Sequence, residues 1–115
     1  MKNKIRIPRG TSFLASVRLQ YDDGTDYPYS SGDAVRFGVK FDPEDTEYAI
    51  LKTCTYDSEA GVYQVNLTPE DTAALNFGRY WYDVGLQTAA GDFWQIVTAD
   101  YFEITVAVTK KEVAT

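Results

Sequence analysis

The chain has no histidine and a single cysteine among its 115 residues. Histidine is the commonest metal ligand and the usual general base at neutral pH, so its absence excludes His-based triads and His-ligated metal sites. A lone thiol forms no internal disulfide, and Cys54 has no imidazole to activate it as a nucleophile. We therefore expect Cys54 to be passive and partly buried, and the protein to be no enzyme, with no metal and no cofactor.

Basic residues and long apolar runs are also scarce. Eleven Lys and Arg residues stand against seventeen Asp and Glu, which gives a net charge of −6. Nucleic acids and anionic membranes require a concentrated positive field, so we expect neither as a partner. No segment approaches the ~20 apolar residues of a membrane span, and the start MKNKIRIPRG has no apolar signal-peptide run. Synthesis in a cytoplasm, without export, is the expectation.

What the chain does contain is enough apolar and aromatic material for one core. Hydrophobic residues make up 44% and aromatic residues 15% of the sequence. A length of this order is typical of one compact domain. We expect that domain to cover residues 1–109, followed by a frayed polar tail at 110–115.

Apolar and polar residues alternate along several short segments that are separated by turn signals. This period of two is typical of half-buried strands, and no amphipathic helix of any length is apparent. Seven or eight such strands predict an all-β sandwich. The predicted strands lie at 4–8, 12–20, 34–41, 48–53, 62–67, 79–86, 93–99 and 101–108.

The segment 67–86, LTPEDTAALNFGRYWYDVGL, contains the one helical signal. Thr68 is an N-cap, Pro69 suits the first helical position, and Asp71 completes a capping box. A short helical turn is expected at 69–75, after which the alternation begins again. A strand entered through such a turn is typical of an immunoglobulin-like sandwich, with Tyr80 as its tyrosine corner.

The last strand pattern is interrupted. Trp94, Ile96, Phe102 and Ile104 keep one parity, but polar residues interrupt it between 98 and 100. We expect a bend or bulge there, which lets one long terminal strand serve both sheets or pair with the first strand.

One sheet face is predicted to carry an unusual aromatic patch. If the predicted strands 34–41, 79–86 and 93–99 share a sheet, its outer face is aromatic and Arg-rich, as protein interfaces are. Two alternatives stay open: incidental exposure, or a register shift by one that buries Phe93 and Val97 and exposes Trp94 and Ile96. The interface candidates are Arg36, Lys40, Arg79, Trp81, Phe93, Val97 and Tyr101, with Asp83 and Gln95 beside them.

Two acidic runs, 22–26 and 42–47, supply oxygen atoms of the kind that calcium prefers. Neither run has the spacing of a twelve-residue calcium loop. Acidic residues next to Gly or Pro are typical of solvated turns, and we interpret both runs in that way.

A series of motifs runs through about 5–106: IRIPRGTSFLASVRL, YDDGTDYPYSSG, AVRFGVKFDPED, LTPEDTAALNFGRYWYDVGLQ, a GD hairpin and FEITV. This series resembles small domains encoded among bacteriophage and prophage tail genes, similar to the N-terminal domain of phage baseplate upper proteins. The resemblance implies an immunoglobulin-like sandwich made in the bacterial cytoplasm and built into a virion tail. The shorter run LTPEDTA also resembles antibody variable domains, although Tyr82 occupies the position of their disulfide cysteine.

Two functions are consistent with these observations. In the first, the domain docks or oligomerises within a phage tail or baseplate, with other phage structural proteins or itself as partner. In the second, it is a carbohydrate-binding module for a cell-surface glycan, in which Trp81, Tyr101 or the loop tyrosines Tyr21, Tyr27 and Tyr29 stack on sugar rings.

Overall fold

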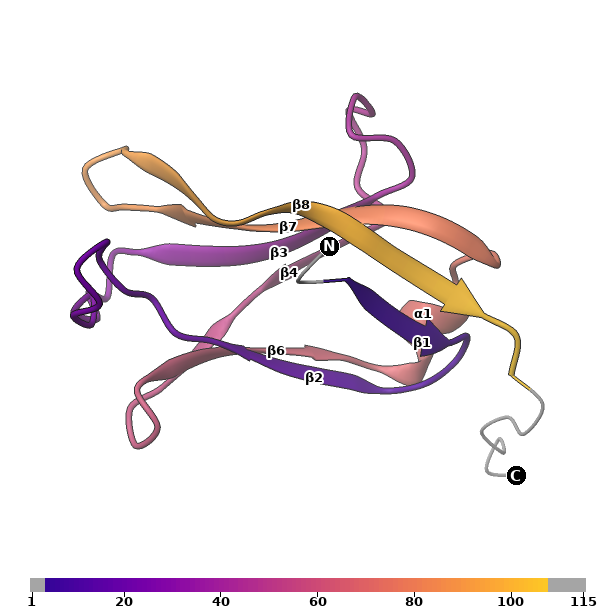
Figure 1. The fold of residues 1–115 in the computed structure, drawn as a ribbon, viewed down its shortest axis with the longest axis horizontal. Coiled ribbons are helices and arrows are strands. Elements are labelled where there is room, and N and C mark those ends of the chain that lie inside the picture. The colour runs from indigo at the N-terminus through magenta and orange to yellow at the C-terminus, as the bar shows by residue number, and fades with distance from the viewer. Residues whose placement is uncertain (1–3, 108–115) are drawn as a thin grey trace.

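The computed structural model describes residues 4–107, which form two β-sheets packed face to face (Figure 1). The first sheet has five strands in the order β1-β8-β7-β3-β4, and the second has three in the order β2-β6-β5. The end of the domain at 109 and the predicted tail lie outside the described residues. The elements are β1 (Ile5–Pro8), β2 (Phe13–Val17), β3 (Ala34–Lys40), β4 (Ile50–Thr53), β5 (Thr55–Asp57), β6 (Val62–Leu67), α1 (Pro69–Ala73), β7 (Gly78–Gln87) and β8 (Phe93–Thr105).

The strand order confirms the predicted immunoglobulin-like sandwich. That fold divides its strands so that β3, β7 and β8 lie in one sheet and β2, β6 and β5 in the other. The terminal strand β8 stays in the first sheet and pairs in parallel with β1, from Ile5 opposite Phe102 to Pro8 opposite Thr105. Of the two arrangements expected for this strand, pairing with the first strand is the one observed.

The core lies between the sheets and follows the predicted period of two. Val35, Phe37 and Val39 of β3 are at most 2% exposed, and alternate residues of its neighbour β7 and of β6 in the opposite sheet belong to the same buried cluster. Fully burying a side chain of this size stabilises the fold by about 1.5–3 kcal/mol. The core positions of β6, β7 and β8 are Tyr63, Val65, Leu67, Tyr80, Tyr82, Val84, Leu86, Phe102 and Ile104.

Helix α1 turns the chain from β6 into β7 through the predicted capping box. The Thr68 hydroxyl accepts a hydrogen bond from the backbone N–H of Asp71, and the Asp71 carboxylate accepts one from the backbone N–H of Thr68. After the helix, the Tyr80 hydroxyl accepts a hydrogen bond from the backbone N–H of Asn76. This contact is the predicted tyrosine corner, and it fixes the direction in which β7 leaves the turn.

Two details of the predicted strands are wrong. The third predicted strand, 34–41, is one residue too long, because β3 ends at Lys40 and Phe41 is 69% exposed at the start of the following loop. Strand β5, which directly follows the crossing between sheets at Cys54, was not predicted. Its three residues are too few for an alternation to be recognised in the sequence.

The expected interruption of the last strand consists of two bulges in β8. Asp100 lies opposite Tyr82, whereas Val97 lies opposite Val84, so two residues of β8 face one of β7. The next pair, Gly85 and Gln95, leaves a further residue of β8 without a partner. Each extra residue reverses the alternation of faces, and two such reversals cancel.

Val97 is therefore a correction to the predicted interface. It lies between the two bulges, where the alternation is reversed, and packs against the core instead of pointing outward. Phe93 and Gln95 lie beyond the second bulge and keep the outward direction that simple alternation predicts. Trp94 has the inward parity but is still 59% exposed, because it lies next to the hairpin.

Candidate functional site: the outer face of the five-stranded sheet

The candidate site is the surface of the five-stranded sheet that faces away from the other sheet, here called the outer face. Alternation with the buried residues places six of the seven predicted interface residues on it, all except Val97. Strand β3 lies antiparallel to β7, and β7 antiparallel to β8, so these side chains form adjacent rows. The six are Arg36, Lys40, Arg79, Trp81, Phe93 and Tyr101.

Two glycines on the outer face let aromatic rings lie directly on the backbone. A Cβ atom added at Gly38 would be 2.7 Å from the Tyr48 ring, and one at Gly85 would be 2.6 Å from the Phe93 ring. Both glycines are buried under these rings, although Tyr48 and Phe93 themselves are 49% and 61% exposed. The Tyr48 and Phe93 rings thus stand above the surface formed by β3 and β7, and we call these two rings the walls.

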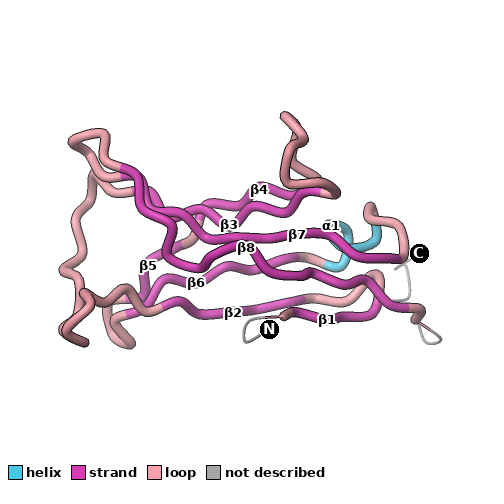
Figure 2. Tube along the Cα trace, turned by 45° about the horizontal axis from the view of Figure 1, so that its top comes forward, coloured by secondary structure: helices cyan, strands magenta, loops and turns pink. Residues whose placement is uncertain are grey.

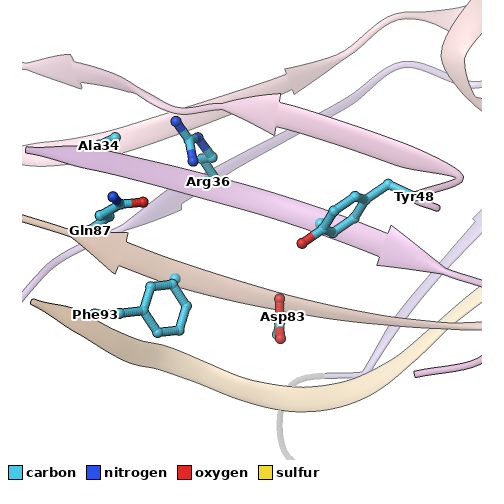
Figure 3. A pocket seen from close by; sticks show the side chains of 8 residues that line it. Ala34, Arg36, Tyr48, Asp83, Gln87 and Phe93 are labelled. Carbon is cyan, nitrogen blue, oxygen red and sulfur yellow. The ribbon is translucent and has the colours of Figure 1, made fainter. Parts of the chain in front are cut away.

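A hollow of about 120 Å³ lies between these two walls (Figure 3). Arg36 of β3 and Asp83 of the neighbouring strand β7 line it, with Gln87 at one end. One oxygen of the Asp83 carboxylate accepts a hydrogen bond of 2.9 Å from the Gln95 amide. Within residues 4–107, the Arg36 side chain has neither an ion-pair nor a hydrogen-bond partner.

A second hollow continues from the first past Tyr48 and is lined by Lys40 and Trp81. The Lys40 ammonium group lies 4.6 Å from the centre of the Tyr48 ring, which is a cation–π contact. Trp81 packs against Tyr101 with ring centres 4.5 Å apart. The outer face therefore presents aromatic rings that neighbouring side chains already hold in place.

At its far end, the outer face is stabilised by charged side chains. The Arg79 guanidinium lies 4.1 Å from the Tyr101 ring centre and donates to Glu103 at 3.3 Å. Lys4, the residue before the edge strand β1, forms an ion pair of 3.0 Å with the same carboxylate. Lys4 first, and then Arg79, lower the pKa of Glu103 below its ordinary value.

The acidic turns have local hydrogen-bonding roles. Asp23 accepts hydrogen bonds from the hydroxyl and the backbone N–H of Thr25, and both lower its pKa. In the second run, Asp42 accepts from the backbone N–H of Glu44, and Asp45 accepts from that of Asp42. Over residues 4–107, no three carboxylate or thiol side chains are grouped closely enough to hold a metal ion.

The loop tyrosines named for sugar stacking pack largely on one another. Tyr29 stacks on Tyr56 with ring centres 4.4 Å apart, and Tyr21 lies 5.5 Å from Tyr27. The Tyr27 hydroxyl donates to Asp33 at 3.1 Å. Only part of each ring remains for a ligand, since Tyr21 and Tyr29 are 52% exposed.

Tyr48 is the site residue that the sequence analysis missed. It precedes β4 in a loop, so no alternation pattern places it, and it reaches the outer face by folding back over Gly38. A signal was nevertheless present. A glycine within a strand rich in Val and Phe often marks the close approach of another group, and both Gly38 and Gly85 are of this kind.

Neither a family model nor a curated protein sequence matches this chain. The geometry of the outer face is therefore the basis for a functional proposal, with the motif resemblance supplying the biological setting. No helix within residues 4–107 has the length and apolar character needed to cross a membrane.

Proposed function

We propose that the protein is a non-enzymatic structural domain of a phage or prophage particle that docks another protein through its outer face. The setting follows from the resemblance to tail and baseplate domains: synthesis in the bacterial cytoplasm and assembly into the virion. The observation that carries the docking role is that Tyr48 and Phe93, roughly half or more exposed, border a hollow that is also lined by Arg36, whose side chain has no partner among residues 4–107.

The composition and rigidity of the outer face support this role. Aromatic residues and Arg are enriched at protein interfaces and account for much of their binding energy. Trp81 is held by Tyr101, and Tyr48 by Lys40, so little rotamer freedom is lost when a partner covers them. The unpaired guanidinium of Arg36 provides planar hydrogen-bond donors for a partner carboxylate.

The test is binding to phage structural proteins encoded by the neighbouring genes, measured by calorimetry with purified proteins. Trp81→Ala and Phe93→Ala should each weaken binding about tenfold or more, as truncations of interface anchors do, while leaving the domain folded. Leu14→Ala is the matched control, because Leu14 is 66% exposed on the opposite sheet. Equal weakening by the control, or melting of the fold by Trp81→Ala, would refute docking through this face.

A second function, carbohydrate binding, is favoured by the polar groups of the hollow. Arg36, Asp83 and Gln87 are planar donors and acceptors suited to sugar hydroxyls, and two aromatic walls flank them. A monomer that binds a cell-surface glycan, and loses it in Tyr48→Ala, would support this function. The absence of binding across a broad glycan panel would eliminate it.

A further inference from the structure

The loop between β3 and β4 rises from the outer side of the five-stranded sheet (Figures 1 and 2). Its carboxylates are of two kinds. Those of Asp42 and Asp45 accept backbone N–H groups and hold the turn together. Those of Glu44 and Glu47 are exposed and have no hydrogen-bond or ion-pair partner within residues 4–107.

Arg36 lies at the other end of the same strand. It is near the start of β3, whereas the loop follows Lys40 at the strand's end, four residues or about 13 Å away at 3.3 Å per residue. Among the described residues, the outer face thus presents a cation without a partner near one end of β3 and two anions without a partner beyond the other. Within a single chain the two groups do not pair.

We propose that the outer face docks a second copy of this chain, with Glu44 and Glu47 of each copy bound to Arg36 of the other. This proposal names the partner of the interaction role argued above and rests on it. A two-fold axis through the middle of the contact places the start of one β3 against the end of the other. The contact between Arg36 and the two glutamates is then made twice, once in each direction across the axis. The same surface serves both copies, as an isologous dimer requires.

The loop geometry fits this arrangement. Because the loop stands above the sheet, its tip reaches across an interface instead of lying flat beside it (Figure 2). On the partner, Arg36 lines the same hollow as Tyr48 and Phe93, so a carboxylate bound to it would lie beside two aromatic rings. A guanidinium binds a carboxylate through two parallel N–H groups, which adds orientation to the attraction.

The net charge of −6 opposes association of two identical chains, but distance decides which effect is larger. Interactions beyond the Debye length, about 8 Å at physiological salt, are largely screened between exposed charges. Ion pairs at the interface act well within that length. The proposed ion pairs are therefore screened much less than the repulsion between distant charges.

A charge exchange tests the proposal by sedimentation velocity from micromolar to millimolar concentration. Arg36→Glu, and separately the double variant Glu44→Arg with Glu47→Arg, should each weaken wild-type dimerisation about tenfold or more. An equimolar mixture of the two variants should recover the dimer, because both contacts then pair opposite charges again. Glu59→Arg, on the turn between β5 and β6, makes a matched charge change away from the outer face and should leave dimerisation unchanged.

The mixture separates pairing across an interface from a general effect of charge on folding. The substituted side chains are exposed and partnerless, so melting temperatures should stay close to that of the wild type. A wild-type chain that remains monomeric at millimolar concentration, glycan-bound or not, overturns the proposal, as does a mixture that fails to associate. If a neighbouring tail protein still docks on this face, only the second copy is excluded and the proposed function stands.

Discussion

The Tyr80 hydroxyl lies 3.1 Å from the backbone nitrogen of Asn76, four residues earlier, and accepts its N–H. The bond closes the short segment between the end of α1 and the start of β7. Tyr80 is itself only 7% exposed and packs edge to face against Phe41. One side chain thus joins the core to the turn that carries the chain from one sheet to the other.

Replacing Tyr80 by Phe should destabilise the protein by about 1 kcal/mol, because the ring stays in place while the Asn76 N–H loses its partner. Thermal unfolding would show a melting temperature lowered by about 4 °C or more. Tyr21→Phe is the control, since this exposed hydroxyl forms no hydrogen bond with residues 4–107. Equal effects of the two substitutions would contradict a tyrosine corner.

Asp71 links the capping box to β4 through an ion pair of 3.0 Å with Lys52. Burial favours the neutral form of Asp71, but the bonds from Thr68 and Lys52 outweigh it and lower the pKa of the carboxyl. Asp71→Asn removes the charge-assisted bonds at both partners. We expect a loss of about 1 kcal/mol at neutral pH, measured by urea unfolding.

The same substitution should alter the acid dependence of stability. Because the pKa of Asp71 is lower in the folded chain, its contribution is complete above the unfolded value of about 3.9 and is lost as pH falls through the folded value. The difference between the wild type and Asp71→Asn should therefore shrink below about pH 4. Asp22→Asn, on an exposed turn, is the control for the loss of one charge and should leave the free energy of unfolding at neutral pH unchanged. A constant difference down to the lowest measurable pH would contradict the ionic role.

Cys54 should resist alkylation in the folded protein. The thiol is 7% exposed, and burial raises its pKa to about 11. At pH 8 only about one thiol in a thousand is then ionised, against roughly one in four for a free cysteine. Iodoacetamide labelling followed by mass spectrometry should therefore be at least a hundredfold slower than in denaturant. Labelling at the same rate in both states would show that the thiol is accessible.

The fold was predictable because its strands follow local rules. The alternation of faces in β3 and β7 is unbroken, and the residues Thr68, Pro69 and Asp71 mark where the helical turn begins. Neither the strands nor the turn needs distant contacts to be recognised. Strand β8 is different. Its two bulges depend on how β7 pairs with it. Val97 was assigned to the wrong face because the sequence of one strand does not determine its register with a neighbouring strand.

The candidate site was predictable only where it lies on regular strands. Arg36, Trp81 and Phe93 follow from period two, whereas Tyr48 reaches the outer face through a loop whose path the sequence does not specify. The Arg36 hollow exists because Tyr48 and Phe93 both cover glycines. Recognising it requires knowing which residues lie above Gly38 and Gly85, and that is tertiary information.

The contact between Gly85 and the Phe93 ring allows the effect of a substitution on docking to be separated from its effect on stability. In Gly85→Ala, the new Cβ atom would meet the tip of the Phe93 ring at 2.6 Å, so the ring must move. Phe93 is 61% exposed at the end of a flexible side chain and can rotate into solvent at little cost. We expect a melting temperature within a few degrees of the wild type, together with a loss of docking similar to that of Phe93→Ala.

The double variant with Gly85→Ala and Phe93→Ala tests whether Gly85 affects docking only through the position of the Phe93 ring. If the glycine acts only by seating the ring, the double variant should bind no more weakly than Phe93→Ala alone, because the two changes remove the same contact. Additive losses would mean that the Gly85 backbone itself contacts the partner. Unchanged docking in Gly85→Ala would mean that the position of the Phe93 ring is irrelevant, and this wall of the hollow would no longer be part of the interface.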